Sequence, residues 1–220
     1  MNIKLPNQVN LFYKKIGFGD PLILLHGNGD SHRDLERLGQ CLSANYTVYL
    51  IDSRGHGNSS HHDKYFVYED LAEDIDLFIT QLNLNDVLII GHSDGAIIAA
   101  LLAMENKLYL RKIILLGITL KPEQMKNKWT TWIQDEYKRH QHPLFRLMIE
   151  EPQIEFHQLE KIRIPSLVVA AEDDVMDQEM YVEIAERIPM GKLFIVENED
   201  HASYVVDTDK FAIKALDFLK

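Results

Sequence analysis

One serine lies in a setting typical of a catalytic nucleophile. The apolar run 87–90 stops at Gly91-His-Ser-Asp-Gly95, and a second apolar run begins at once. A serine on a sharp turn between a strand and a helix projects its hydroxyl from the sheet edge, and only small residues fit two positions away on either side. Ser93 is therefore a candidate nucleophile, and the N–H of Asp94 a candidate oxyanion donor. The alternative is a glycine-rich turn with an incidental serine.

Such a serine needs an acid and then a histidine further along the chain. Asp174 follows the apolar run 167–170, and His201 follows the run 193–196. Active sites of open α/β sheets assemble at the carboxyl ends of the strands, where both residues are expected. Asp173 is the competing acid, and together with Asp177 these carboxylates could instead form a solvated acidic turn. A single histidine in a loop is more often a surface residue, so His201 depends on its place in this order.

Two further glycine turns follow predicted strands. His26-Gly-Asn-Gly29 could supply a second oxyanion N–H, with Asn28 as the expected donor. In Asp52-Ser-Arg-Gly-His-Gly57 the glycines permit a tight turn, and Arg54 or His56 could brace the neighbouring loops. We expect a structural role for the second turn, since nothing in it improves the chemistry.

These residues require a sheet to position them. Short apolar runs recur without polar alternation, as in strands covered on both faces, and segments with helical spacing lie between them. This alternation predicts an α/β fold with a doubly wound sheet, and residues 3–5 and 9–15 predict an antiparallel hairpin at its edge. The runs are 22–25, 48–51, 87–90, 113–116, 167–170 and 193–196, and the helical segments 68–82, 96–104, 178–188 and 209–219.

The segment from about 121 to 161 breaks this rhythm, because it contains no strand-like run. We interpret it as a short helical lid inserted into a single domain that covers residues 1–220. Its large apolar side chains could line an acyl pocket or pack the lid onto the sheet, and the sequence does not decide between the two. The pocket candidates are Trp129, Trp132, Phe145 and Met148.

Composition excludes several classes of function. The chain has 220 residues, and its formal charge of −11 argues against nucleic acid and anionic membranes as partners. The single cysteine permits no internal disulfide, and no apolar run is long enough for a signal peptide or a membrane span. We therefore expect a cytoplasmic protein that acts on a small molecule.

Ten histidines raise the question of a metal site. The densest clusters are His61-His62-Asp63 and the pair His140 and His142, and neither has the spacing of a known metal motif. We interpret both as exposed polar loop residues and predict neither a metal nor a cofactor.

Five stretches together resemble the signature of the α/β-hydrolase superfamily. The resemblance implies an eight-stranded, mostly parallel sheet with a lid after the sixth strand. It also implies Ser93, Asp174 and His201 as the triad, with the N–H groups of Asn28 and Asp94 as the oxyanion hole. The stretches occur in the family's order, at 26–29, 52–59, 91–95, 171–174 and 200–201.

Two features depart from the family pattern. Position 94 is often Met, Leu or Gln in relatives, and the carboxylate of Asp94 would oppose an oxyanion unless it points away. The lid is also short, which argues against large substrates. We predict a serine hydrolase of small esters, with a carbon–carbon or small-amide hydrolase, or a non-catalytic binding protein, as the alternatives.

Overall fold

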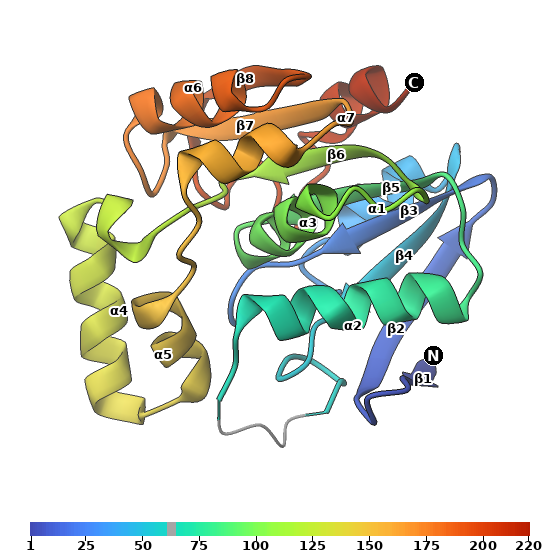
Figure 1. Cartoon of the computed structure of the whole chain (residues 1–220), viewed down its shortest axis with the longest axis horizontal. Helices are drawn as coiled ribbons and strands as arrows, with labels where there is room; N and C mark the ends of the chain where they lie inside the picture. The colour runs from blue at the N-terminus through green and yellow to red at the C-terminus, as the bar shows by residue number, and fades with distance from the viewer. Residues whose placement is uncertain (61–64) are drawn as a thin grey trace.

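The computed structural model describes residues 1–60 and 65–220, and its centre is one eight-stranded sheet (Figure 1). The strand order across the sheet is β1-β2-β4-β3-β5-β6-β7-β8. This confirms the predicted eight-stranded α/β fold, and each of the six apolar runs lies in a strand. The strands are β1 (Asn2–Lys4), β2 (Asn10–Gly17), β3 (Asp20–Leu25), β4 (Tyr46–Asp52), β5 (Val87–His92), β6 (Leu110–Leu116), β7 (Ser166–Asp173) and β8 (Gly191–Asp200).

Strand direction follows the predicted pattern. From β4 to β8 every neighbouring pair is parallel. At the other edge β1 pairs with β2, and β2 with β4, in antiparallel fashion, which confirms the predicted edge hairpin. All parallel strands therefore end at the same edge, where the loops that follow them meet.

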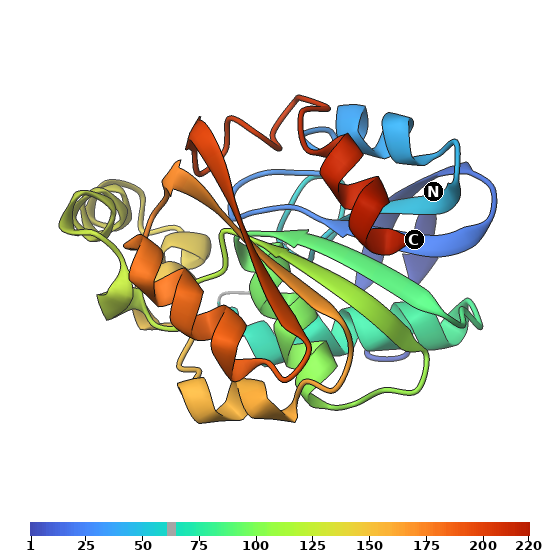
Figure 2. The same cartoon turned by 90° about the horizontal axis from the view of Figure 1, so that it is seen from above.

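Helices cover both faces of the sheet, as the apolar runs require (Figure 2). Along β3, Leu22 and Leu24 pack in one core with α1 and α7, whereas Ile23 and Leu25 pack in the other core with α2, α3 and α6. Successive side chains of a strand point to opposite faces, so an all-apolar strand fills both cores. The helices are α1 (Glu36–Leu42), α2 (Tyr68–Gln81), α3 (Asp94–Met104), α6 (Gln178–Arg187) and α7 (Ala212–Leu219).

Helix α1 is missing from the sequence prediction, and the reason is local. It has only seven residues, and Gly39 near its middle lowers its intrinsic helix propensity. A Cβ at Gly39 would lie 3.1 Å from a methyl of Leu50 in β4. The glycine therefore lets the helix approach the sheet closely, a packing requirement that the local pattern does not reveal.

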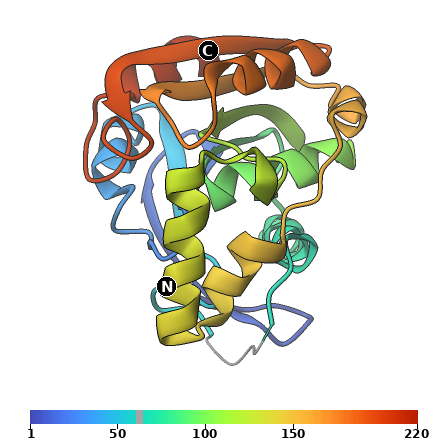
Figure 3. The ribbon, with the colours of Figure 1, turned by 90° about the vertical axis from the view of Figure 1, so that its left-hand side faces the viewer.

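The segment between β6 and β7, which the sequence analysis interprets as a lid, is helical. It contains α4 (Asn127–His140) and α5 (Pro143–Glu150), flanked by short 3-10 turns at Pro122–Gln124 and Phe156–Lys161. Figure 3 shows the two helices side by side, and Figure 1 places them at one end of the molecule. No helix in the described ranges is long and apolar enough to cross a membrane.

Candidate active site

Ser93 occupies a strained turn between β5 and α3. Its backbone has φ 52° and ψ −113°, and α3 begins at the next residue. A positive φ is uncommon for a residue with a side chain, and it is maintained only where the surroundings hold it in place. The N–H of Ser93 donates to the carbonyl of Leu116 at 2.8 Å, which ties the turn to the end of β6.

The two glycines of the turn are required by space. A Cβ at Gly91 would lie 2.1 Å from the carbonyl oxygen of Gly95, and a Cβ at Gly95 would lie 2.3 Å from that of Leu25. Both separations are far below van der Waals contact. A larger residue at either position would collide with the backbone. The expectation that only small residues fit on either side of Ser93 is therefore confirmed.

Sheet register brings Asp174 and His201 together. Asp173 pairs with Asp200 between the parallel strands β7 and β8, so the next residue of each strand leaves the sheet at the same level. His201 Nδ1 lies 2.6 Å from Asp174 Oδ1. The N–H groups of Ala171 and Val175 donate to the same carboxylate, at 2.8 and 2.7 Å. A charged acceptor with three donors is held in one orientation.

Electrostatics favours the ionised form of Asp174. Burial of the side chain opposes ionisation, but the hydrogen bond and charge of His201 and the two backbone donors outweigh it, so the pKa of Asp174 lies below its ordinary value. The carboxylate therefore orients the imidazole and stabilises its protonated form.

The competing acids have other environments. Asp173 is exposed, and its carboxylate lies 3.2 Å from Lys126 Nζ and 2.9 Å from Lys128 Nζ. These lysines lower its pKa through hydrogen bonds and charge. Asp177 is exposed just before α6. Of the three carboxylates considered from sequence, only that of Asp174 contacts His201.

Gly117 makes room for the imidazole of His201, a role that sequence reasoning missed. It follows β6 with φ 61°, and a Cβ there would lie 2.6 Å from Cε1 and 2.7 Å from Nδ1 of His201. The signal was available as a glycine directly after the apolar run 113–116, but a glycine at a strand end usually marks only a turn.

Replacing Gly117 with alanine should therefore displace His201. We expect kcat/KM for an activated ester to fall by about 100-fold, because a shift of about 1 Å in a reacting group has an effect of that size. Steady-state kinetics on the folded fraction, with Tm measured in parallel, separates this loss from backbone strain. Wild-type kcat/KM in Gly117→Ala would show that His201 does not need this position.

His92 positions the loop that carries His201. Its Nε2 lies 2.9 Å from the carbonyl oxygen of His201, an acceptor, so Nε2 carries the proton. Burial and the nearby His201 lower the pKa of His92 to about 3, which leaves the ring neutral. Its Nδ1 is therefore an acceptor, and it is buried with no hydrogen-bond partner among the described residues.

Two backbone N–H groups near Ser93 suit an oxyanion. Those of Asn28 and Asp94 donate to no acceptor in the described part of the chain. Asp94 is the first residue of α3, where the N–H groups lack intrahelical acceptors. The side chain of Asn28 donates to Asp94 Oδ2 at 2.9 Å and to the carbonyl of Leu144 in α5 at 3.2 Å. These bonds hold the 26–29 loop against α3 and α5.

The carboxylate of Asp94 is turned into the protein. Its oxygens accept hydrogen bonds from Tyr68 Oη at 2.8 Å and from Asn28 Nδ2, and the residue is 5% exposed. Burial raises its pKa despite these two donors. The Asp94 carboxylate therefore opposes an oxyanion less than the sequence suggested. Tyr68, which sequence reasoning did not select, contributes to this by binding the carboxylate.

Ser93 and His201 line one cavity of about 590 Å³. The four pocket candidates of the sequence line the same cavity, two from α4 and two from α5. Their aromatic rings pack edge to face, with centroids 6.1 Å apart for Trp129 and Trp132 and 5.8 Å for Trp132 and Phe145. Apolar lining around a few polar groups is typical of small-molecule sites.

The turn at 52–57 has the expected bracing role. The guanidinium of Arg54 donates to Asp74 of α2 at 2.5 and 2.6 Å. The carboxylate of Asp52 accepts the backbone N–H groups of His32 and Asn58, at 2.6 and 2.8 Å. The first contact ties the turn to helix α2, and the second ties it to His32 in the loop that follows residues 26–29. None of these residues lines the cavity of Ser93.

The metal candidates have ordinary environments where the structure describes them. His140 is exposed beside Glu136, and His142 accepts the N–H of Leu144 at the start of α5. No group of three metal-binding side chains is found in residues 1–60 and 65–220. His61, His62 and Asp63 lie outside the described residues.

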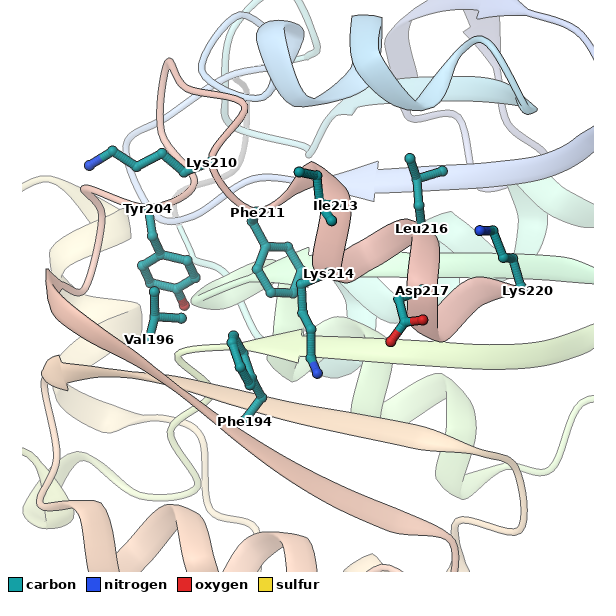
Figure 4. Close-up of a pocket in the computed structure, with 10 residues that line it drawn as sticks. All are labelled: Phe194, Val196, Tyr204, Lys210, Phe211, Ile213, Lys214, Leu216, Asp217 and Lys220. Carbon is teal, nitrogen blue, oxygen red and sulfur yellow. The ribbon is translucent and has the colours of Figure 1, made fainter.

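A second cavity of about 510 Å³ lies between β8 and α7 (Figure 4). Lys214 Nζ of α7 lies 4.3 Å from the ring centroid of Phe194 in β8, and Phe211 lines the same cavity. It shares no lining residue with the cavity of Ser93, and its lining includes no serine, cysteine or histidine. We therefore place the candidate chemistry at Ser93.

Comparison with known proteins agrees with this geometry. Residues 20–150 match the sequence profile described as the alpha/beta hydrolase fold. The chain belongs to this family. The match begins at β3 and covers Ser93 and Asn28. Asp174 and His201 lie beyond it, so their assignment depends on the contacts described above.

Curated members of the α/β-hydrolase family match part of the chain. Non-heme chloroperoxidase CPO-A1 of Kitasatospora aureofaciens is 36% identical over 90 residues, which are 40% of this chain and 32% of that protein. The AB hydrolase superfamily protein YisY of Bacillus subtilis is 31% identical over 117 residues, 52% of this chain and 44% of that protein. The chain thus spans about a third to a half of the length of these relatives.

Solved α/β-hydrolase structures match nearly the whole chain. Est816, described as an N-acyl homoserine lactone degrading enzyme, has a TM-score of 0.85 at 20% identity and covers 99% of this chain and 100% of its own. A thermophilic esterase from Thermogutta terrifontis has a TM-score of 0.81 at 17% identity, with 100% and 97% covered. At this identity the likeness shows the fold alone.

Proposed function

We propose that this chain is a serine hydrolase that cleaves a small carboxylic ester through an acyl-enzyme. The observation that carries the proposal is the 2.6 Å contact of His201 with Asp174 beside the cavity that also contains Ser93. The positive φ of Ser93 at the start of α3 supports the same assignment, since it is the geometry of a nucleophile elbow.

The first half of the reaction forms the acyl-enzyme. His201 Nε2 takes the proton of Ser93 Oγ as the oxygen attacks the ester carbonyl carbon. The carbonyl oxygen becomes an oxyanion, which accepts hydrogen bonds from the N–H groups of Asn28 and Asp94. The tetrahedral intermediate then collapses, the carbon–oxygen bond to the alcohol breaks, and His201 returns the proton to the alcohol.

The second half releases the acid. A water molecule gives its proton to His201 and attacks the acyl carbon, and the proton then passes to Ser93 Oγ as the bond between the acyl carbon and Ser93 Oγ breaks. Asp174 keeps the Nδ1 proton of His201 in place throughout and stabilises the imidazolium. One oxyanion donor contributes about 3–4 kcal/mol to transition-state stabilisation in comparable sites.

A panel of matched esters, thioesters, lactones, amides and carbon–carbon substrates tests the reaction class. We expect the highest kcat/KM for a small ester. A clear preference for a carbon–carbon bond or an amide would replace the ester proposal while retaining the same nucleophile. No turnover of any member, together with binding of one, would favour a non-catalytic ligand-binding protein.

The lid proposal predicts an effect on chain-length preference. Trp132 is 48% exposed and packs against Trp129 and Phe145 in the cavity wall. We propose that α4 and α5 form the acyl-binding side, so Trp132→Ala should move the optimum among p-nitrophenyl esters from acetate to octanoate toward longer chains. The measurement is kcat/KM for each ester, and an unchanged ranking would assign Trp132 to packing alone.

A further inference from the structure

The cavity of Ser93 carries an uneven distribution of charge. Five carboxylates are among its lining residues, those of Asp30, Asp94, Glu151, Asp173 and Asp200. Burial is the main cause that raises the pKa of the Asp30, Asp94 and Glu151 carboxyls. The single lysine or arginine in the described lining is Lys128, and its ammonium is paired with exposed Asp173.

Asp30 is a partly exposed carboxylate of this lining with no described lysine or arginine beside it. Its side chain is 30% exposed, whereas that of Asp94 is committed to Tyr68 and Asn28. No lysine or arginine in the described residues lies within 4.0 Å of the Asp30 carboxylate. Burial, Asp34 and Asp94 raise its pKa to about 6, against the opposing effects of a backbone hydrogen bond from Gly27 and of His201, so most Asp30 side chains are ionised at pH 7.

His92 supplies a second, independent acceptor at the same place. Its Nδ1 lies 4.0 Å from Asp30 Oδ2, too far for a hydrogen bond between them. Since Nε2 of the neutral ring donates to the His201 carbonyl, Nδ1 carries a lone pair, and His92 is 3% exposed. The buried, unpartnered Nδ1 and the partly exposed Asp30 carboxylate thus converge with no lysine or arginine of the described residues beside them, and an unsatisfied buried acceptor such as Nδ1 is costly. An ammonium group, with three N–H donors, would satisfy both.

This acceptor pair lies next to the nucleophile. A Cβ placed on Gly27 would be 3.0 Å from Asp30 Oδ2, 3.3 Å from His92 Nδ1 and 3.3 Å from Ser93 Cβ. The Ser93 side chain therefore stands beside the two acceptors across a single glycine. A cation held there would be close to the ester carbonyl that Ser93 attacks.

We infer that the site selects esters with a cationic amine near the scissile carbonyl, and that Asp30, assisted by His92 Nδ1, is the residue that recognises this amine. The inference deepens the proposed function and depends on it for the position of the carbonyl. Anionic acyl groups are disfavoured by the same charge, because no described cation of the lining is free to pair with them.

Three benzyl esters of similar size test this inference at pH 7. They are the ester of alanine, which carries a cationic amine, that of propionate, which is neutral, and the monoester of succinate, which is anionic. We expect wild-type kcat/KM to favour the alanine ester over the propionate ester by at least about tenfold, and the succinate monoester to be the poorest. Equal values for the alanine and propionate esters would overturn the inference.

The matched variants are Asp30→Asn and Asp173→Asn. Each removes one carboxylate charge, but that of Asp173 is already paired with Lys126 and Lys128. Asp30→Asn should reduce the preference to within about twofold by lowering kcat/KM for the alanine ester and sparing the propionate ester. Asp173→Asn should keep the preference. An equal loss of the preference in both variants would mean that the overall negative charge of the cavity causes the preference. That result would overturn the assignment to Asp30.

A binding measurement separates this inference from the proposed function. Calorimetry on Ser93→Ala compares phenylalaninamide with 3-phenylpropanamide, which lacks only the amine. Tighter binding of the amine, lost when Asp30→Asn is added, supports the inference even if no ester is hydrolysed. Equal binding of the two amides rejects it even if neutral esters are good substrates.

Stability should change in the opposite direction to recognition. Because the folded-state pKa of Asp30 is raised from 3.8 to about 6, ionisation of Asp30 opposes folding as pH rises through this range. Asp30→Asn should therefore raise Tm at pH 8, and the gain should shrink toward pH 4, where the carboxyl is protonated in the folded state. A lower Tm at pH 8 would show that the carboxylate has a stabilising partner and would contradict its role as an open acceptor.

Discussion

Replacing Ser93 with alanine abolishes hydrolysis of p-nitrophenyl acetate, with an expected loss of roughly 10⁴-fold or more in kcat. In the proposed mechanism Ser93 Oγ forms the bond to the acyl carbon, and no other group of the site would replace it. The remaining oxyanion donors and the cavity leave only a small enhancement over water. Alanine can adopt the same backbone conformation as serine at position 93. The close backbone packing of the turn depends on Gly91 and Gly95, which the variant keeps. Tm should stay within a few degrees of wild type.

Ser43→Ala is the control for this variant. Ser43 is partly buried at the end of α1, where its hydroxyl donates to the carbonyl of Gln40. It should retain wild-type activity. Full activity in Ser93→Ala, with purity established by mass spectrometry, would remove Ser93 from the reaction.

Replacing Asp174 with asparagine has the second-largest expected effect, a loss of about 10⁴-fold in kcat, as in other serine hydrolases whose orienting acid is changed. An amide in this position cannot stabilise the imidazolium of His201, and it favours the wrong tautomer of the ring. KM should change little, because Asp174 is buried, with only 1% of its surface exposed, and so does not contact the substrate. The pH dependence of kcat, measured for both proteins, reports the loss of imidazolium stabilisation.

Asp173→Asn is the matched control, since the two carboxylates are neighbours in the chain. Asp173 is exposed and paired with Lys126 and Lys128, so its removal should leave kcat within about twofold of wild type. The reverse result, with Asp173→Asn inactive and Asp174→Asn active, would mean that the wrong acid has been assigned.

Asp174 also contributes to stability, in a defined pH range. Its pKa is lowered in the folded state, so its contribution is present above the unfolded value near 3.8 and disappears as pH falls through the folded value. Asp174→Asn should therefore lower Tm at pH 7 more than at pH 3. This loss is distinct from the catalytic one, because kcat is measured on folded enzyme.

Much of the fold was predictable from local pattern. Each apolar run that predicts a strand lies in β3 to β8, and the glycines around Ser93 stand where the turn requires them. Chain order then placed Asp174 and His201 at the ends of adjacent strands. The pairing of Asp173 with Asp200 converts that order into contact, but this register is a property of the assembled sheet.

Other features depend on contacts between distant residues and have no local signal. Tyr68 meets Asp94 from the first turn of α2, and Gly117 meets His201 from the end of β6. The buried Nδ1 of His92 has no hydrogen-bond partner among the described residues, which only a structure reveals. Short spacing rules therefore predict the reacting groups better than the groups that position them or select the substrate.

Covalent labelling with a fluorophosphonate, followed by peptide mass spectrometry, tests the central claim most directly. The account predicts one adduct per chain, located on Ser93, formed rapidly in the wild type, much more slowly in Asp174→Asn and not at all in Ser93→Ala. An adduct on another residue, or no adduct on folded protein, would contradict the claim that Ser93, His201 and Asp174 act as one nucleophilic unit.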